Sequence, residues 1–192
     1  MKASDDRKLE DVIRFLLNHH TFLHEKRIQK LVFLADLHSI QTRGRRLVEA
    51  DFKRYYHGVY SEKIALALQS LQGVDVRPDT GPDGAPTFVF LRPKKALPTP
   101  HITREDRKIL EEILQAYKSL STEELAQVGK STLLWESAEF GEQLDYDAYL
   151  RDPSSRLTPQ MKKAFEVAIE ERRRGRPKTY ATVDDMVADS RS

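Results

Sequence analysis

The chain has 192 residues, a net charge of +2 and no cysteine. The lack of cysteine excludes disulfides and thiolate metal sites within the chain, and it is compatible with a reducing compartment. Charged residues make up 32% of the sequence, and the two signs are nearly balanced. The overall electrostatic potential of the protein therefore does not indicate that nucleic acid is its partner. We expect one main domain with a small appendage.

The amino terminus, MKASDDRKLEDVIRFLL, has acidic residues where a signal peptide would have a basic segment followed by an apolar one. We therefore expect a cytoplasmic protein. The same segment predicts the first helix, because its apolar residues follow the three-and-four spacing of one buried stripe. These residues are Leu9, Val12, Ile13, Leu16 and Leu17.

A second helix is predicted over residues 25–40. Its residues from Leu31 to Leu37 leave almost no polar face, which indicates a helix surrounded by protein. The apolar run is too short to span a membrane, so no membrane association is expected. Asp36 and His38 interrupt this run. Polar groups of this kind need a hydrogen-bonding partner or contact with solvent when the helix is buried.

A turn-rich, aromatic segment follows this helix. Gly44 turns the chain between Arg43 and Arg45, after which tyrosines gather around a second glycine. That glycine supplies the backbone freedom of a sharp turn before a helix that Ser61 caps. Tyrosine is rigid and amphipathic, and is therefore well suited to interfaces. The aromatic segment contains Phe52, Tyr55, Tyr56, His57, Gly58 and Tyr60.

Residues 74–91 predict a β-hairpin, because two strand-like runs flank a loop that contains Asp83 and Gly84. Helices are predicted next from Thr103 and, after a capping box of Ser121 and Glu124, from the following residues. A last helix should open at Thr158, where a proline follows the cap.

The expected fold is mainly α with a small β-hairpin (α+β). It comprises a compact helical domain over residues 1–150, a C-terminal helix over residues 151–174 and a flexible tail over residues 175–192 that is first basic and then acidic.

A basic motif lies between this last helix and the tail. An Arg-Gly-Arg-Pro core resembles an AT-hook, in which glycine permits close approach to a narrow minor groove. The alternative is an ordinary helix end, where arginines complement the helix dipole, glycine caps the helix and proline stops it. Both functions are compatible with the same residues, namely Arg173, Arg174, Gly175, Arg176, Pro177 and Lys178.

Catalytic and metal signatures are weak. His20 and His24 lie four residues apart, and with Asp36 and His38 they could in principle ligate zinc. However, a helix break near Thr21 disrupts that geometry, and the sequence contains no HExxH motif, nucleophile elbow or phosphate loop. We therefore expect no enzyme, no cofactor and no metal.

The motif order gives a more specific expectation. QKLVFLAD, a glycine, YYHGVYSEKI and then a leucine-rich helix resemble the Panacea domain, also called the SocA-like antitoxin domain. The resemblance continues into LSTEELAQVGKSTLLW, through Leu125 and Trp135, and covers residues 8–140. It implies an antitoxin that silences a toxic bacterial or phage partner by direct contact, with no catalytic residues to carry over.

Three function classes follow from these observations. The favoured one is a protein that binds and neutralises a cognate toxin. The alternative is a DNA-binding regulator of A/T-rich operator DNA, with a winged-helix-like order of helix and hairpin and the AT-hook-like arm. The third, a metal-dependent enzyme, rests only on scattered histidines. The predicted partner-binding residues are Asp36, His38, Arg43, Arg45, Tyr55, Tyr56, His57, Gly58, Tyr60 and Trp135.

Overall fold

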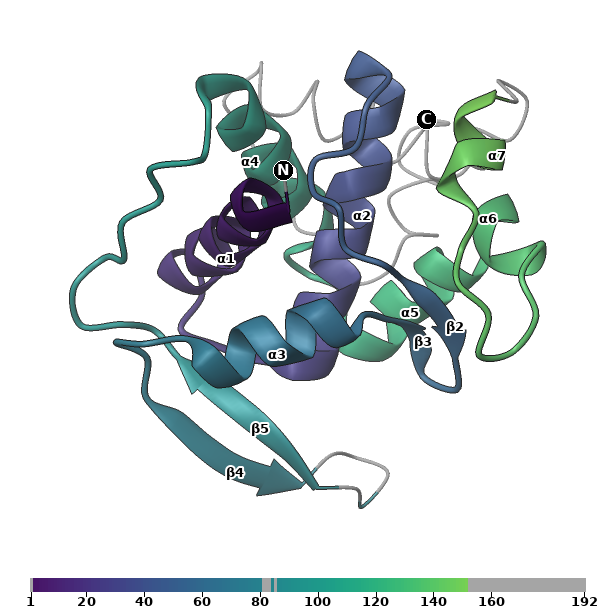
Figure 1. Ribbon diagram of the computed structural model, residues 1–192. Helices are drawn as coiled ribbons and strands as arrows, with labels where there is room; N and C mark the ends of the chain where they lie inside the picture. Colours follow the sequence, from purple (N-terminus) through teal and green to yellow (C-terminus); the bar gives the residue numbers. More distant parts are fainter. Residues whose placement is uncertain (1, 81–83, 85, 152–192) are drawn as a thin grey trace, which may run out of the picture.

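Helix α2 (Glu25–Arg43) runs through the centre of the computed structural model, and the other elements pack around it (Figure 1). The structure describes residues 2–80, 84 and 86–151. Its remaining elements are α1 (Lys2–Asn18), β1 (Phe22–His24), β2 (Lys53–Tyr55), β3 (Gly58–Tyr60), α3 (Glu62–Ser70), β4 (Val76–Thr80), β5 (Pro86–Leu91), α4 (Arg104–Tyr117), α5 (Thr122–Lys130), α6 (Leu133–Glu136) and α7 (Tyr146–Arg151).

The predicted central helix is confirmed, and it is longer than its apolar pattern indicated. Every residue from Ile28 to Ile40 is buried, as expected for a helix with apolar side chains on all sides. The helix ends at Gly44, whose φ of 69° is left-handed and whose N–H donates to the Ile40 carbonyl at 2.8 Å. The core of the domain therefore forms around α2.

A three-stranded antiparallel sheet, ordered β1-β5-β4, lies beside this core. The predicted hairpin is confirmed as β4 and β5, in which Val76 is paired with Phe90. Strand β1 was not predicted; it pairs Leu23 with Phe90 and so attaches the hairpin to the chain just before α2. A strand of three residues between two helices is too short to show the alternating pattern of a strand, so only the tertiary structure reveals this pairing.

The aromatic segment, predicted as a turn, is a second hairpin made of β2 and β3. Residues 141–144 return along β2: the Arg54 N–H donates to the Glu142 carbonyl at 2.9 Å, and the Leu144 N–H donates to the Phe52 carbonyl at 2.8 Å. This pairing brings the segment after α6 alongside the aromatic hairpin.

Local helix signals in the second half of the chain are confirmed. The Ser121 hydroxyl accepts from the Glu124 N–H at 3.1 Å, and Glu124 accepts from the Ser121 N–H, which completes the predicted capping box. Thr103 and Asp106 form a second box at the start of α4. The short helices α6 and α7 were not predicted, and the helix expected from Thr158 lies outside the described residues.

The observed class is mainly α with small antiparallel strands, as expected. Across the described residues, no helix combines the length and the apolar character needed to cross a membrane.

Candidate functional site

Four aromatic side chains gather on the surface beside the β2–β3 hairpin, and we name them the aromatic patch: Tyr55, Tyr56, Tyr60 and Phe140. The Phe140 ring lies 4.3 Å from the Tyr56 ring and 5.5 Å from the Tyr55 ring, between centroids. Tyr55 also contacts Tyr60 at 5.7 Å. Tyr56 is 72% exposed and Phe140 is 54% exposed, so these rings pack on one another while their outer faces remain in water.

Hydrogen bonds between the hairpin and the segment after α6 hold the aromatic patch in place. The Gly141 N–H donates to the Arg54 carbonyl at 2.8 Å, which holds Phe140 next to the hairpin. The Arg54 guanidinium donates to the Ala138 carbonyl at 2.7 Å and lies 5.2 Å from the centre of the Trp135 ring. Trp135 itself is only 7% exposed, so it contacts Arg54 from the interior and presents little surface to a partner.

Two further predicted site residues are in the core. The Asp36 carboxylate accepts from Arg46 Nε at 2.7 Å and from the Leu47 N–H at 2.6 Å. His38 Nε2 lies 2.8 Å from Glu112 Oε2 of α4, in a buried pair. Both groups satisfy the need of a buried polar residue for a partner, so their roles in this structure are internal.

Arg43 and Arg45 lie at the carboxyl end of α2, beside α4 and away from β2 and β3 (Figure 1). Arg43 forms a 2.7 Å ion pair with Asp106, and the exposed Arg45 lies 3.6 Å from Glu105. Of the predicted partner-binding residues, the structure therefore brings together those of the β2–β3 hairpin, with Trp135 beneath, and separates the arginines from them.

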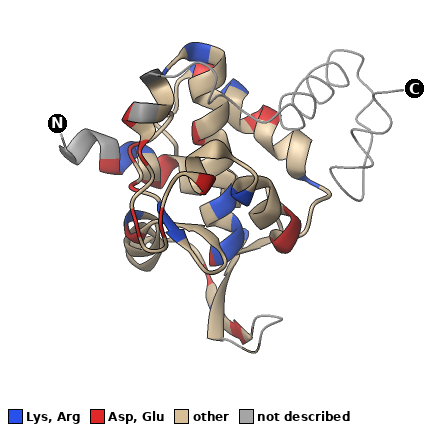
Figure 2. Cartoon of the chain, turned by 90° about the vertical axis from the view of Figure 1, so that its right-hand side faces the viewer, with Lys and Arg blue, Asp and Glu red and all other residues tan. Residues whose placement is uncertain are grey.

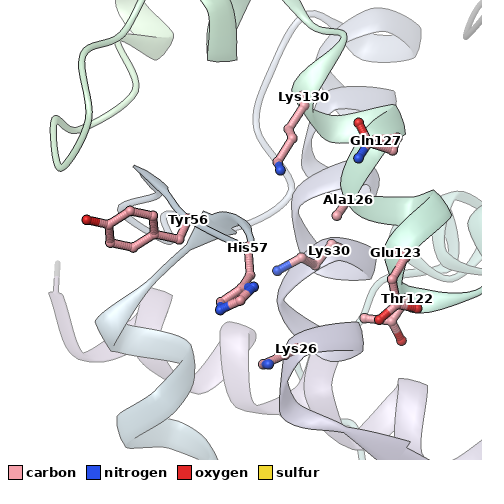
Figure 3. Close-up of a pocket in the computed structure, with 9 residues that line it drawn as sticks. All are labelled: Lys26, Lys30, Tyr56, His57, Thr122, Glu123, Ala126, Gln127 and Lys130. Atoms are coloured by element: carbon pink, nitrogen blue, oxygen red, sulfur yellow. The ribbon is translucent and has the colours of Figure 1, made fainter. Parts of the chain in front are cut away.

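A cavity of about 350 Å³ adjoins the patch, between α2, the β2–β3 turn and α5. We name it the lysine pocket, and its polar lining includes Lys26, Lys30, His57, Glu123 and Lys130. Figure 3 shows the three lysine ammonium groups directed toward the turn that carries His57, while the Tyr56 ring points away from them. Tyr56 thus belongs to the rim of the pocket and to the patch.

Lys30 is the unusual member of this set, because it is only 4% exposed. Its ammonium donates to the Val59 carbonyl at 3.3 Å. Burial, followed by the nearby positive charges of Lys26 and Lys130, lowers the pKa of Lys30 to about 8, against weaker opposition from Glu25 and Glu123. The pocket therefore contains a cation that the fold itself does not fully compensate.

The lowered pKa makes the Lys30→Met variant informative about stability. Between pH 8 and 10.5 the unfolded chain keeps a proton that the folded chain releases, so the free energy of unfolding of the wild type should rise with pH there. The difference between the two pKa values corresponds to roughly 3 kcal/mol. We expect the free energy of unfolding of Lys30→Met, relative to the wild type, to be highest at pH 7 and to fall by roughly 3 kcal/mol by pH 10.5. Urea unfolding at each pH measures this difference.

The matched control is Lys108→Met, because Lys108 is exposed on α4 outside the pocket. Its unfolding free energy should follow the wild type at each pH. A Lys30→Met curve parallel to the wild type would show that Lys30 has no lowered pKa in the folded protein.

Gly58 allows the hairpin to close over Lys30. Its φ is +98°, a region that other residues rarely adopt, and a Cβ there would lie 3.3 Å from Lys30 Cε and 3.4 Å from Ala126 Cβ. The glycine predicted from the sequence as a sharp turn is therefore also a point of close approach between β3, α2 and α5.

We expect Gly58→Ala to lower the free energy of unfolding by about 1–3 kcal/mol, because it adds backbone strain and a close contact. Gly44→Ala is the control: Gly44 also has a positive φ, but an added Cβ there meets nothing within 4 Å. Chemical unfolding should show the larger loss for Gly58→Ala. Equal losses would mean that the close approach adds nothing to the backbone strain.

Sequence reasoning missed Phe140 and Lys30. Phe140 follows a polar stretch and precedes Gly141, and an isolated aromatic residue of this kind was a readable but nonspecific signal. Lys30 was detectable as a single cation beside the apolar run of α2. Neither signal indicated which surface the residue would join.

A comparison with protein families identifies the domain. The family model described as antitoxin SocA-like, Panacea domain matches residues 28–136, more than half of the chain. The chain belongs to the SocA-like Panacea family. No curated protein and no solved structure matches it.

The SocA-like match begins within α2 and ends with α6, so it includes the β2–β3 hairpin and most of the lysine pocket. Phe140 lies four residues beyond its end. Membership supports an antitoxin-type role in general.

The predicted nucleic-acid residues, Arg173 to Lys178, lie outside the described residues. Within the described part, helix α3 does precede the β4–β5 hairpin, which is the order of a winged helix. Its exposed side chains include Glu62, Leu66 and Gln69, a poor set for reading base edges or contacting phosphates. Figure 2 shows basic and acidic residues interspersed in its view of the described chain.

Proposed function

We propose that this SocA-like protein is an antitoxin that neutralises a cognate toxin by direct contact, with the aromatic patch at the centre of the interface. The observation that carries this proposal is the contact of Tyr55, Tyr56 and Phe140 with one another at an exposed surface. Contiguous exposed aromatic groups on a soluble domain typically mark an interaction site, and tyrosine is enriched among residues that dominate binding energy.

The support beneath the patch favours tight binding. The backbone pairing of the hairpin with the returning 141–144 segment holds the rings before a partner arrives. A surface that is already ordered loses less conformational entropy on association than a mobile loop does. The patch is thus suited to a stable complex, as neutralisation by binding requires.

The test is co-expression of the tagged chain with the gene beside its own. We expect the neighbour alone to arrest growth, and the pair to restore growth and to co-purify as a complex. A neighbour without toxicity that also forms no complex would contradict the proposal. Salt-dependent binding to an A/T-rich duplex would then measure the DNA-binding alternative.

A further inference from the structure

The lysine pocket combines high positive charge with a deeply buried ammonium group, that of Lys30. Lys26, Lys30 and Lys130 contribute three cations, and Glu123 is the acidic residue of its lining within the described chain. An ammonium group has three N–H donors, and that of Lys30 donates to the Val59 carbonyl at 3.3 Å. A buried cation of this kind is stabilised by an anion that enters the cavity.

The pocket also continues the aromatic patch. Tyr56 lies on the rim of the pocket, and its ring contacts Phe140 in the patch at 4.3 Å. A protein that covers the patch therefore also covers the mouth of the pocket. We infer that the lysine pocket receives a carboxylate of the partner protein, from an Asp or Glu side chain that enters beside Tyr56. This inference rests on the proposed function and adds the chemistry of the contact.

A carboxylate fits this site better than a phosphate does. Phosphate sites commonly use free N–H groups at the start of a helix. At the start of α5, the Glu124 N–H already donates to the Ser121 hydroxyl, and Glu123 adds a negative charge to the pocket. The lysines present ammonium groups from two helices, and these donate to carboxylate and phosphate oxygens alike. The choice of a carboxylate therefore rests on the occupied helix start, on the charge of Glu123 and on a protein as the partner.

The experiment measures the affinity of the full chain for the product of the adjacent gene, for the wild type and for charge-removing variants. Lys30→Met keeps the apolar stem and removes the ammonium, and Lys130→Gln tests the pocket at a position that is less buried than Lys30. We expect each variant to weaken binding roughly ten- to a hundredfold, as for loss of a charged hydrogen bond. Lys108→Gln, outside the pocket, should bind as the wild type does.

The carboxylate itself is found by changing each surface Asp and Glu of the partner to its amide. One of these changes should weaken the wild-type complex but have little further effect on the Lys30→Met complex, which is the signature of a direct pair. Wild-type affinity for both Lys30→Met and Lys130→Gln would overturn the inference. So would a set of partner changes in which none couples to Lys30.

A second arm does not need the partner. Acetate and inorganic phosphate are titrated into the full chain at constant ionic strength, and the amide signals of Gly58 and Ala126 report on the pocket by NMR. Acetate-induced shifts that disappear in Lys30→Met would support the inference. Shifts that persist in that variant, or phosphate-induced shifts alone, would overturn it.

The two proposals fail in different ways. If the wild-type chain forms no complex with the neighbour, the proposed function fails. If the complex forms and depends on Tyr56 and Phe140 but not on Lys30 or Lys130, only the carboxylate contact fails.

Discussion

Asp36→Ala is expected to destabilise the domain by about 3–5 kcal/mol, the typical cost of removing one partner from a buried ion pair. Asp36 is fully buried and accepts hydrogen bonds from Arg46 and from the N–H groups of Leu47 and Val48. Its removal leaves the Arg46 guanidinium without its carboxylate and two backbone donors without an acceptor. Urea unfolding monitored by circular dichroism measures the loss.

Asp51→Ala is the matched control, because Asp51 forms a 2.8 Å ion pair with Lys63 in which both side chains are substantially exposed. Its loss should be no more than about 1 kcal/mol. A similarly small loss for Asp36→Ala would contradict the structural role given to this carboxylate. It would return Asp36 to the candidates for partner contact.

The double variant Tyr56→Ala/Phe140→Ala should weaken the proposed toxin complex by about 2–4 kcal/mol, or roughly 30- to 1000-fold, because it removes the centre of the aromatic patch. Both side chains are more than half exposed, so the free energy of unfolding should change little. Titration calorimetry with the purified partner measures the affinity. Growth rescue in cells should fail in parallel.

Phe88→Ala provides a close control for this variant. Phe88 is 51% exposed, against 54% for Phe140, but it lies on β5 outside the patch. It should keep affinity and rescue. If Phe88→Ala were as damaging as the double variant, the interface would include the β1-β5-β4 sheet and the patch would lose its central role.

Features set by local interactions were predictable from the sequence. The central apolar helix, the turn at Gly44, the β4–β5 hairpin and the capping box of Ser121 and Glu124 are all confirmed, although the helix ends three residues later than predicted. Each depends on residues that are close together in the chain, so periodicity and capping chemistry suffice to predict it. The resemblance to the SocA-like family is confirmed for the same reason, since its motifs are short runs of consecutive residues.

The residues of the candidate site could be predicted only in part from local sequence patterns. The tyrosines around Gly58 were predicted to be interface residues, and the structure exposes Tyr55 and Tyr56. Asp36, His38 and Trp135 were placed in the same predicted site, but the structure buries all three. A side chain's residue type does not say which face of the fold it occupies, because that depends on partners distant in sequence.

By itself, the sequence determined the helical class, the turn at Gly58 and the antitoxin family, because these follow from local spacing and short motifs. Only the tertiary structure decided that Asp36 pairs with Arg46, that Phe140 joins Tyr56, and that Lys30 opens into a pocket shared with Lys130. Each of these contacts joins residues from separate elements. Packing around α2 and strand pairing with β2 bring them together, and neither leaves a periodic signal in the chain.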